Sequence, residues 1–277
     1  MPESEYVLGH SERELARLER QALVYAGLTR DSLRRAGIAP GMQVLDIGCG
    51  TGDVAFLAAE TVGASGSVLA VDRAPAALDL ARRRAEKNGV RNVRFQQGEL
   101  GSLALDGGFD AIVGRLVVVY MSDPVASLRP LLRALRPGGI LLLIEMDISS
   151  GTTVPLLPLF NRAMSWIRDV YARMGLEPET GSHLHALLRA LDLEPEMIGV
   201  SLIEGGLEAG AYDYLAETVR SVAPAAEKFG IASAEEMTPD TLAERMRSEA
   251  TLHTCIVYPR MVSAWARIPA SDVDRVR

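Results

Sequence analysis

The regular alternation of short apolar runs and amphipathic stretches between residues 42 and 145 is the feature that most constrains the fold. The apolar runs, which we expect to be β-strands, cover residues 43–47, 67–71, 93–96, 111–113 and 140–145. Stretches with apolar residues at helical spacing cover residues 53–61, 75–88 and 123–135. Apolar strands that alternate with helices pair in parallel and are covered on both faces. The pattern therefore predicts an α/β fold with a doubly wound parallel sheet.

After residue 145, longer helical stretches separate two further apolar runs, at residues 196–203 and 254–259. Helices are expected over Ser11–Gly37, Val154–Met174 and Tyr212–Phe229, and another from the Thr238-Pro239-Asp240 cap. The two runs bring the expected strands to seven, so the helices are interpreted as insertions on a seven-stranded core. The apolar stripe of Val154–Met174 fits ordinary core packing and also a lid over a hydrophobic substrate, and the sequence leaves both open.

Length and composition indicate one folded domain. The chain has 277 residues, of which 48% are hydrophobic and 23% charged, and this mixture excludes wholesale disorder. No internal repeat or linker divides the chain, so we predict a single domain over residues 1–277. Its core is expected over residues 38–150, 181–204 and 252–268, and a helical cover over residues 1–37, 151–180 and 205–251.

Charge and cysteine content argue against several classes of function. The net charge of −7 disfavours a nucleic-acid partner. Two cysteines are too few for a disulfide framework or a zinc site of several cysteines, and no other group of side chains has metal-ligand spacing. The sequence shows no secretory signal, and its apolar runs are far shorter than the roughly 20 residues that cross a bilayer. We therefore predict a cytoplasmic protein with no metal and no membrane partner.

A glycine-rich turn follows the first expected strand, in the segment Val44–Asp53. Its glycines stand at positions 48, 50 and 52, where they allow positive φ and let a ligand approach the backbone. The helix that follows offers free N–H groups to a ligand. A strand, a glycine turn and a helix in this order indicate a nucleotide or nucleoside cofactor.

The residues around the glycines narrow the choice of cofactor. The dinucleotide fingerprint needs a different glycine spacing, and here Asp53 follows the turn while Asp46 precedes it. Two carboxylates would repel a pyrophosphate but suit a ligand that carries an ammonium and a sulfonium. No Lys-Ser or Lys-Thr pair follows, as a phosphate-binding P-loop requires.

Asp72 ends the second expected strand, 24 residues after Gly48. A carboxylate there can accept hydrogen bonds from both hydroxyls of an adenosine ribose. The alternative is that Asp72 caps the helix that begins near Pro75. Paired with the glycine turn at this spacing, Asp72 is predicted to bind the ribose.

Five segments together resemble a known family. They are VLDIGCGTGD (44–53), VLAVD (68–72), VRFQQGEL (93–100), FDAIVGRLVVVYMSDP (109–124) and LRPGGILLLIE (135–145). The set resembles the class I S-adenosylmethionine-dependent methyltransferases, and most of all the bacterial small-molecule enzymes grouped with the ubiquinone and menaquinone C-methylases. The resemblance implies a Rossmann-like, seven-stranded, mostly parallel sheet with helical lid insertions, and S-adenosylmethionine as the cofactor.

The resemblance also implies roles for individual residues. It places Asp46, Gly48 and Gly50 at the methionine end of the cofactor, Asp72 at the ribose, Arg73, Glu99 and Leu100 beside the adenine, Arg115 below the methyl group, and Tyr6 and His10 over the cofactor. Glu99 is a departure, since the family usually has Asp there, and this leaves its hydrogen bond to the adenine unassigned.

The implied activity is in-line methyl transfer to O, C or N of a small, largely hydrophobic organic molecule, in secondary or quinone-like metabolism. The fourth strand ends without the Asn/Asp-Pro-Pro-aromatic motif of base methylases, which agrees with the negative charge. Two alternatives stay open. One is a methyltransferase-like protein that keeps the cofactor or the fold without methylating, and the other is an NAD(P)-dependent oxidoreductase. The sequence also leaves a homodimer open.

A methyl acceptor with a hydroxyl or an acidic carbon needs a base, and His253 and His183 are the candidates. The resemblance implies that the strand over 254–259 runs antiparallel to the others, which would place His253 at the cofactor edge. His183 opens a helix after the first insertion. The alternative is that His253 caps a strand or pairs with Glu249.

Overall fold

The computed structural model describes residues 12–100, 103, 105 and 107–269, with residues 12–20 described by their backbone alone. The chain forms two compact units. Among the described residues, the first unit comprises 12–21, Met146–Ser182 and Gly199–Val262. The second comprises 22–145, without the gaps named above, His183–Ile198 and 263–269. The single domain expected from the sequence stays a prediction.

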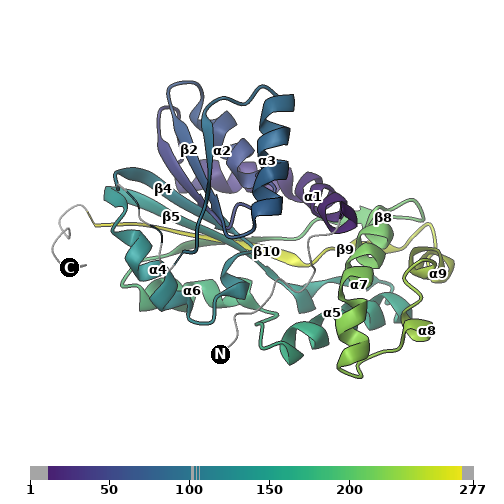
Figure 1. Ribbon diagram of the computed structural model, residues 1–277. Helices are drawn as coiled ribbons and strands as arrows, with labels where there is room; N and C mark the ends of the chain where they lie inside the picture. Colours follow the sequence, from purple (N-terminus) through teal and green to yellow (C-terminus); the bar gives the residue numbers. More distant parts are fainter. Residues whose placement is uncertain (1–11, 101–102, 104, 106, 270–277) are drawn as a thin grey trace. The chain divides into compact units, whose positions relative to one another are not determined.

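A seven-stranded sheet has the strand order β3-β2-β1-β4-β5-β10-β7 (Figure 1). Its strands are β1 (Gln43–Ile47), β2 (Ser67–Asp72), β3 (Val93–Gln97), β4 (Phe109–Arg115), β5 (Leu135–Asp147), β7 (Glu196–Val200) and β10 (Arg260–Arg267). The first five pair in parallel with their neighbours in this order. They are connected through α2 (Asp53–Val62), α3 (Pro75–Lys87) and α4 (Pro124–Leu132). The predicted doubly wound α/β fold is therefore confirmed.

The central strands form the core of the second unit because their side chains are apolar on both faces. Val44, Leu45 and Ile47 are fully buried, and β5 has an unbroken buried run from Ile140 to Glu145. In the register, Ile47 lies beside Gly114 of β4. The carboxyl ends of β1 and β4 are thus level, at the edge where open α/β sheets bind their ligands.

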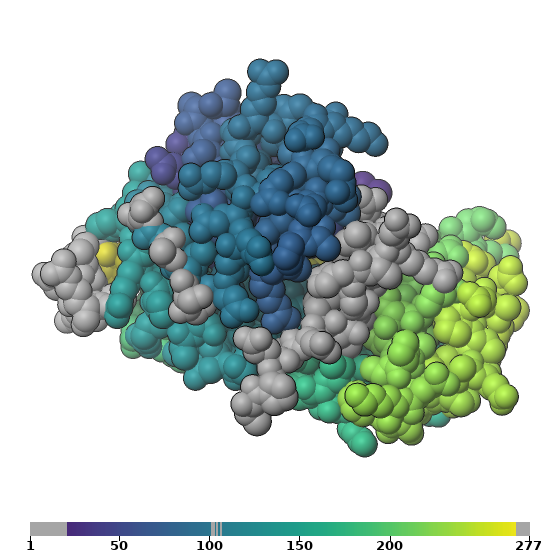
Figure 2. All heavy atoms as spheres, viewed as in Figure 1, coloured from purple at the N-terminus to yellow at the C-terminus, as the bar shows by residue number. Residues whose placement is uncertain are grey.

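The helix α3 shows how the sequence sets the outer layer of this unit. Its buried residues are alanines and one leucine at helical spacing, Ala77, Leu78, Ala81 and Ala85. Pro75 starts the helix, where its fixed φ fits and its missing N–H is not needed. The remaining positions are mostly charged and exposed, and they form part of the blue surface in Figure 2.

The predicted last strand of the sheet is wrong. Cys255–Val257 forms β9, which pairs antiparallel with β6 (Thr152–Val154) and β8 (Ile203–Gly205) in a separate sheet. Pro259 lies between β9 and β10, and it has no N–H to donate within a sheet, so the two strands are separated there. The strand that joins the seven-stranded sheet is β10. Near the start of β5, Gly139 accepts the N–H of Ile268, the residue after β10, and Gly138 donates its N–H to the Ile268 carbonyl. The start of β10 contacts the end of β5, so the two strands run antiparallel.

The helices of the first unit are close to the expected ones. They include α5 (Pro158–Arg173), α7 (Ala211–Lys228), α8 (Ala234–Met237) and α9 (Leu242–Glu249), and α5 packs against α7 and α9. Phe160, Met164 and Ile167 of the apolar stripe are buried, which favours core packing for these side chains. Two helices, α1 (Glu12–Ala36) and α6 (Thr180–Ala190), complete the described set. None of the helices in the described part is long and apolar enough to cross a bilayer.

Candidate functional site

The glycine turn between β1 and α2 has the backbone that its sequence predicts. Gly48, Gly50 and Gly52 have φ of 64°, 51° and 89°, values that side chains other than glycine adopt only with strain. A Cβ added to Gly48 would lie 2.4 Å from Cγ2 of Val117, whereas a Cβ on Gly50 would meet nothing within 4 Å. Gly48 is therefore required by the packing, and Gly50 faces open space that a ligand could fill.

Asp72 connects this turn to the end of β2. One carboxylate oxygen accepts the N–H of Gly50 at 2.8 Å, and the other accepts the N–H of Ala74 at 2.9 Å. The second bond lies just before α3, whose N-cap is Ala74 without a side-chain cap, so Asp72 braces the entry to the helix but is not its N-cap. Each carboxylate oxygen has two lone pairs, and both oxygens keep one for a further donor such as a ribose hydroxyl.

Asp46 is the most unusual residue at this edge. It is 1% exposed, and neither carboxylate oxygen accepts a hydrogen bond of ordinary geometry from the described residues. Burial raises the pKa of Asp46 well above its usual value, against a smaller lowering by the positive charge of Arg115. Buried polar groups almost always have partners. A carboxylate without one fits a cationic ligand group, such as the ammonium expected from the sequence.

Asp53, the first residue of α2, is compensated within the protein. It forms an ion pair with Arg84 at 2.7 Å and accepts a hydrogen bond from the Thr51 hydroxyl. Its charge is therefore balanced by Arg84. Of the two acids at the turn, Asp46 is the one whose carboxyl group would disfavour a pyrophosphate.

Arg115 ends β4, and its guanidinium donates to the hydroxyl of Thr29 at 2.9 Å. Among the other predicted cofactor residues, Arg73 and Glu99 are exposed and Leu100 is half-buried. Tyr6 and His10 lie outside the described residues. The cofactor roles of this group stay predictions.

The two candidate bases are both exposed. His183 belongs to α6 in the second unit, and His253 belongs to a turn before β9 in the first. The backbone N–H of His253 donates to the Thr251 hydroxyl at 3.2 Å. Glu249, the suggested partner of His253, accepts the N–H of Leu159 at 3.0 Å. Neither histidine belongs to the glycine turn or to the strand ends around it, and the base role stays a prediction.

Sequence reasoning missed Glu145, the only acidic residue in the apolar run of β5. It is completely buried, and one carboxylate oxygen accepts the N–H groups of Val117 and Val118, both at 2.8 Å. Burial raises the pKa of Glu145 to about 8, against a lowering by these hydrogen bonds. The sequence does contain an indication of this site, because a glutamate that continues an apolar strand is expected to be buried, and buried glutamates almost always have a partner.

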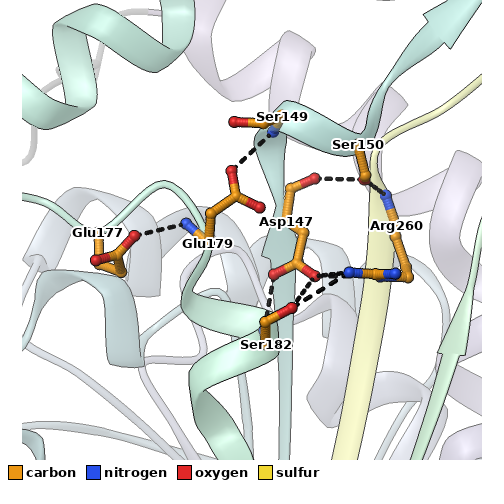
Figure 3. Close-up of polar contacts among 7 residues, drawn as sticks. All are labelled: Asp147, Ser149, Ser150, Glu177, Glu179, Ser182 and Arg260. Carbon is orange, nitrogen blue, oxygen red and sulfur yellow. Dashed lines mark hydrogen bonds and ion pairs between the residues drawn. The ribbon is translucent and has the colours of Figure 1, made fainter.

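A second buried carboxylate, Asp147, is the last residue of β5 and belongs to the first unit (Figure 3). It accepts the N–H and the hydroxyl of Ser182, each at 2.7 Å, and forms an ion pair with Arg260 at 2.6 Å. Arg260 also donates to it through Nε at 3.1 Å. These bonds fix the end of β5, the first turn of α6 and the start of β10 to one another. Asp147 therefore has a structural role.

Among the described residues, no group of three or more His, Cys, Asp and Glu side chains could hold a metal ion. The sheet edge offers the glycine turn, the hydrogen-bonded carboxylate of Asp72 and the buried carboxylate of Asp46, which has no hydrogen-bond partner among the described residues. Together they suit an organic cation that carries a sugar.

Comparison with known proteins agrees with this chemistry. Residues 38–177 match the family model described as a methyltransferase domain. The demethylmenaquinone methyltransferase of Lactococcus lactis is 32% identical over 146 residues, which cover 52% of this chain and 56% of that protein. The arsenite methyltransferase of Halobacterium salinarum is 39% identical over 105 residues, which cover 38% of this chain and 27% of that protein.

The fold is shared with solved structures. The YcgJ protein of Bacillus subtilis has 22% identity and a TM-score of 0.57, with 86% of this chain and 96% of that chain covered. The matched region spans about half of the first curated relative and about a quarter of the second. Because the family model covers just over half of the sequence, this chain belongs to the class I S-adenosylmethionine-dependent methyltransferases.

Proposed function

We propose that this protein transfers a methyl group from S-adenosylmethionine to O, C or N of a small, largely hydrophobic organic molecule. One observation carries the proposal: the buried, unpartnered carboxylate of Asp46 beside the glycine turn of a methyltransferase domain. A cation bound there would stabilise the ionised carboxylate that burial otherwise disfavours. The cofactor of this family carries such cationic groups, whereas a dinucleotide brings a pyrophosphate.

The residues at the sheet edge fit the parts of the cofactor. Asp46 is proposed to receive its ammonium group, and Asp72 its ribose hydroxyls. The open space at Gly50 admits the ligand against the backbone. The bound cofactor supplies a methyl group activated by a positively charged sulfur. The protein's remaining task is to hold the acceptor atom in line with that group and to exclude water.

An organic acceptor is favoured over arsenite by the state of the cysteines. Trivalent arsenic prefers soft thiolate ligands. The chain has only Cys49 and Cys255, and Cys49 is buried in the glycine turn. Burial raises the pKa of the Cys49 thiol, so it is not a ready thiolate. The relative named for demethylmenaquinone supports a quinone-like acceptor instead.

Two measurements test the proposal. Calorimetric titration with S-adenosylmethionine and with NAD should show binding of the first alone, and the reverse result would favour an oxidoreductase. A mass-spectrometric screen of phenols, polyketide-like compounds, quinols and amines should then detect the gain of one CH₂ unit. Cofactor binding without methylation of any class would favour the methyltransferase-like alternative.

The wider setting stays a prediction. We further propose a role in secondary or quinone-like biosynthesis, a cytoplasmic location, a homodimer and a helical cover over the substrate.

A further inference from the structure

Glu145 holds the loop that follows β4. Its Oε1 atom accepts two consecutive backbone N–H groups, those of Val117 and Val118, at 2.8 Å each. Its Oε2 atom is buried and accepts no hydrogen bond from the described residues. One carboxyl group thus accepts two N–H groups of the loop, while Leu116, Tyr120 and Met121 donate theirs to backbone carbonyls.

The loop needs such an acceptor because its backbone is strained. Leu116 has a φ of 54°, a left-handed conformation that is unfavourable for a residue with a Cβ. The short helical turn η1 (Val118–Tyr120) follows directly, and Val117 precedes it without any side-chain cap of its own. A single turn leaves its first N–H groups without intrahelical partners. Glu145 satisfies two of these groups from the neighbouring strand.

Val117 in turn packs onto the cofactor turn. One of its methyl groups lies 2.4 Å from the position that a Cβ would take on Gly48, and the other lies 2.8 Å from the corresponding position on Gly114. Both distances are shorter than atoms can approach, so neither glycine could carry a side chain without a shift of Val117. Ile47, the last residue of β1, also packs against Gly114. The position of Val117 therefore determines how the backbone of Gly48 lies.

We propose that Glu145 is a positioning residue for the cofactor site, which acts through Val117 to hold Gly48 in the geometry that binds S-adenosylmethionine. The inference deepens the proposed function and rests on it. Glu145 does not touch the cofactor in this scheme. It fixes the loop before the ligand arrives, so that the ligand does not have to order it.

The pKa of about 8 agrees with this role. Burial raises this pKa, and the N–H groups of Val117, Val118 and Val119 lower it by a smaller amount. At neutral pH the carboxyl is therefore mainly protonated, and its Oε1 still accepts two N–H groups. A glutamine, which keeps a carbonyl oxygen at the same place, should replace it.

The test compares two substitutions at this position by calorimetric titration with S-adenosylmethionine. Glu145→Gln should bind within about threefold of the wild type. Glu145→Met removes the acceptor, and the loss of two neutral hydrogen bonds should raise Kd by about tenfold. If Glu145→Met does not fold, Glu145→Asp replaces it, since it withdraws the carboxyl by one methylene. Equal affinity of the wild type and the acceptor-less variant would overturn the proposal.

Two further readouts separate positioning from a general loss of stability. Amide hydrogen exchange of Val117 and Val118 without ligand should be faster in Glu145→Met and unchanged in Glu145→Gln. Val117→Ala should weaken binding as well, and the double variant should be no weaker than the poorer single one, because both act on one loop. Fully additive losses would show that Glu145 does not act through Val117.

A control from the same strand completes the design. Asp147→Asn alters a buried carboxylate two residues away that does not contact the loop, so it should leave Kd unchanged. If the wild type itself does not bind S-adenosylmethionine, the proposed function fails. If the wild type binds and Glu145→Met binds equally well, only the positioning role fails.

Discussion

Glu145 and Asp147 lie two residues apart on β5, and both are completely buried carboxylates. Asp147 accepts bonds on both oxygens, from Ser182 and from Arg260. Glu145 accepts two N–H groups on one oxygen, and its other oxygen has no partner among the described residues. Asp147 belongs to the unit with α5 and α7, and Glu145 belongs to the unit with the glycine turn.

This difference in hydrogen-bond partners corresponds to a difference in role. A buried polar group without a partner carries a free-energy penalty, which a structural role alone does not require. At the cofactor edge two carboxyl groups, Asp46 and Glu145, have such atoms. Asp147 has none. We infer that a buried carboxyl oxygen with neither a hydrogen bond nor an ion pair among the described residues indicates the ligand site, whereas fully paired carboxyl groups such as Asp147 stabilise the framework. Asp110 is of the second kind, because Arg136 forms an ion pair with its Oδ1. Substitutions should divide accordingly into losses of affinity and losses of stability.

The largest expected effect is that of Gly50→Val, which should abolish measurable binding of S-adenosylmethionine. A branched side chain tolerates the positive φ poorly and would fill the space that the ligand needs. Calorimetric titration of the folded variant measures this. Gly89→Val is the matched control, because Gly89 has a φ of 66° and equally open surroundings. Tight binding by the Gly50 variant would move the cofactor site elsewhere.

Arg260→Ala should reduce the free energy of unfolding by about 2–3 kcal/mol without changing cofactor affinity. Removing one partner of a buried ion pair leaves an uncompensated charge, although water already solvates part of Arg260, whose side chain is 45% exposed. Urea denaturation gives the stability. Adding Asp147→Asn to this variant should restore part of the loss, because it removes the stranded charge. A large drop in affinity would contradict a purely structural role.

Asp72→Ala should weaken S-adenosylmethionine binding by roughly tenfold to a few hundredfold, since hydrogen bonds to a charged group contribute about 1.5–3 kcal/mol. Its side chain also braces Gly50, so the loss combines ribose contacts with the geometry of the turn. Asp110→Ala is the control. Asp110 is a buried aspartate near the opposite end of β4 that accepts the N–H of Gln43, and its loss should affect stability alone. Unchanged affinity of a folded Asp72 variant would exclude the ribose role.

The pH dependence of stability should distinguish Glu145 from its neighbour. The pKa of Glu145 is about 8 in the folded state against 4.5 for an exposed carboxyl. Between these values the folded protein holds a proton that the unfolded chain releases, so stability falls as pH rises, by up to about 1.4 kcal/mol per pH unit. Denaturation of the wild type and of Glu145→Gln from pH 5 to pH 8 should show this slope lost in the variant. Parallel curves would mean that Glu145 is ionised throughout.

Much of the second unit could be predicted from the sequence because its signals are local. The apolar runs of β1 and β2, the glycine turn and the acid at position 72 follow one another within 30 residues, and each expresses one physical requirement. The last strand could not be placed in this way. Residues 254–259 and 260–267 are both apolar, and which of them joins the main sheet depends on pairing with β5, far away in the sequence.

The roles of buried acids were also beyond the sequence. Glu145 and Asp147 occupy alternate positions of one strand and look equivalent, since nothing nearby in the sequence tells which will meet Arg260. Their difference arises from residues more than 25 positions away on other elements. Whether each oxygen of a buried carboxyl group has a hydrogen-bond partner is decided by the tertiary structure.

The smallest expected effect is that of His253→Gln. A general base contributes roughly 10²–10⁴-fold to a rate. Such a base must be held against its proton donor, however, and His253 is exposed on a turn, where its backbone N–H donates to the Thr251 hydroxyl. We therefore expect turnover at saturating cofactor to fall by less than about tenfold, with His183→Gln as the parallel variant. A loss of a hundredfold or more for either one, with cofactor affinity unchanged, would assign that histidine as the base. The catalytic group would then be a residue other than Asp46 and Glu145, the buried acids of the cofactor edge that have oxygens without hydrogen-bond partners.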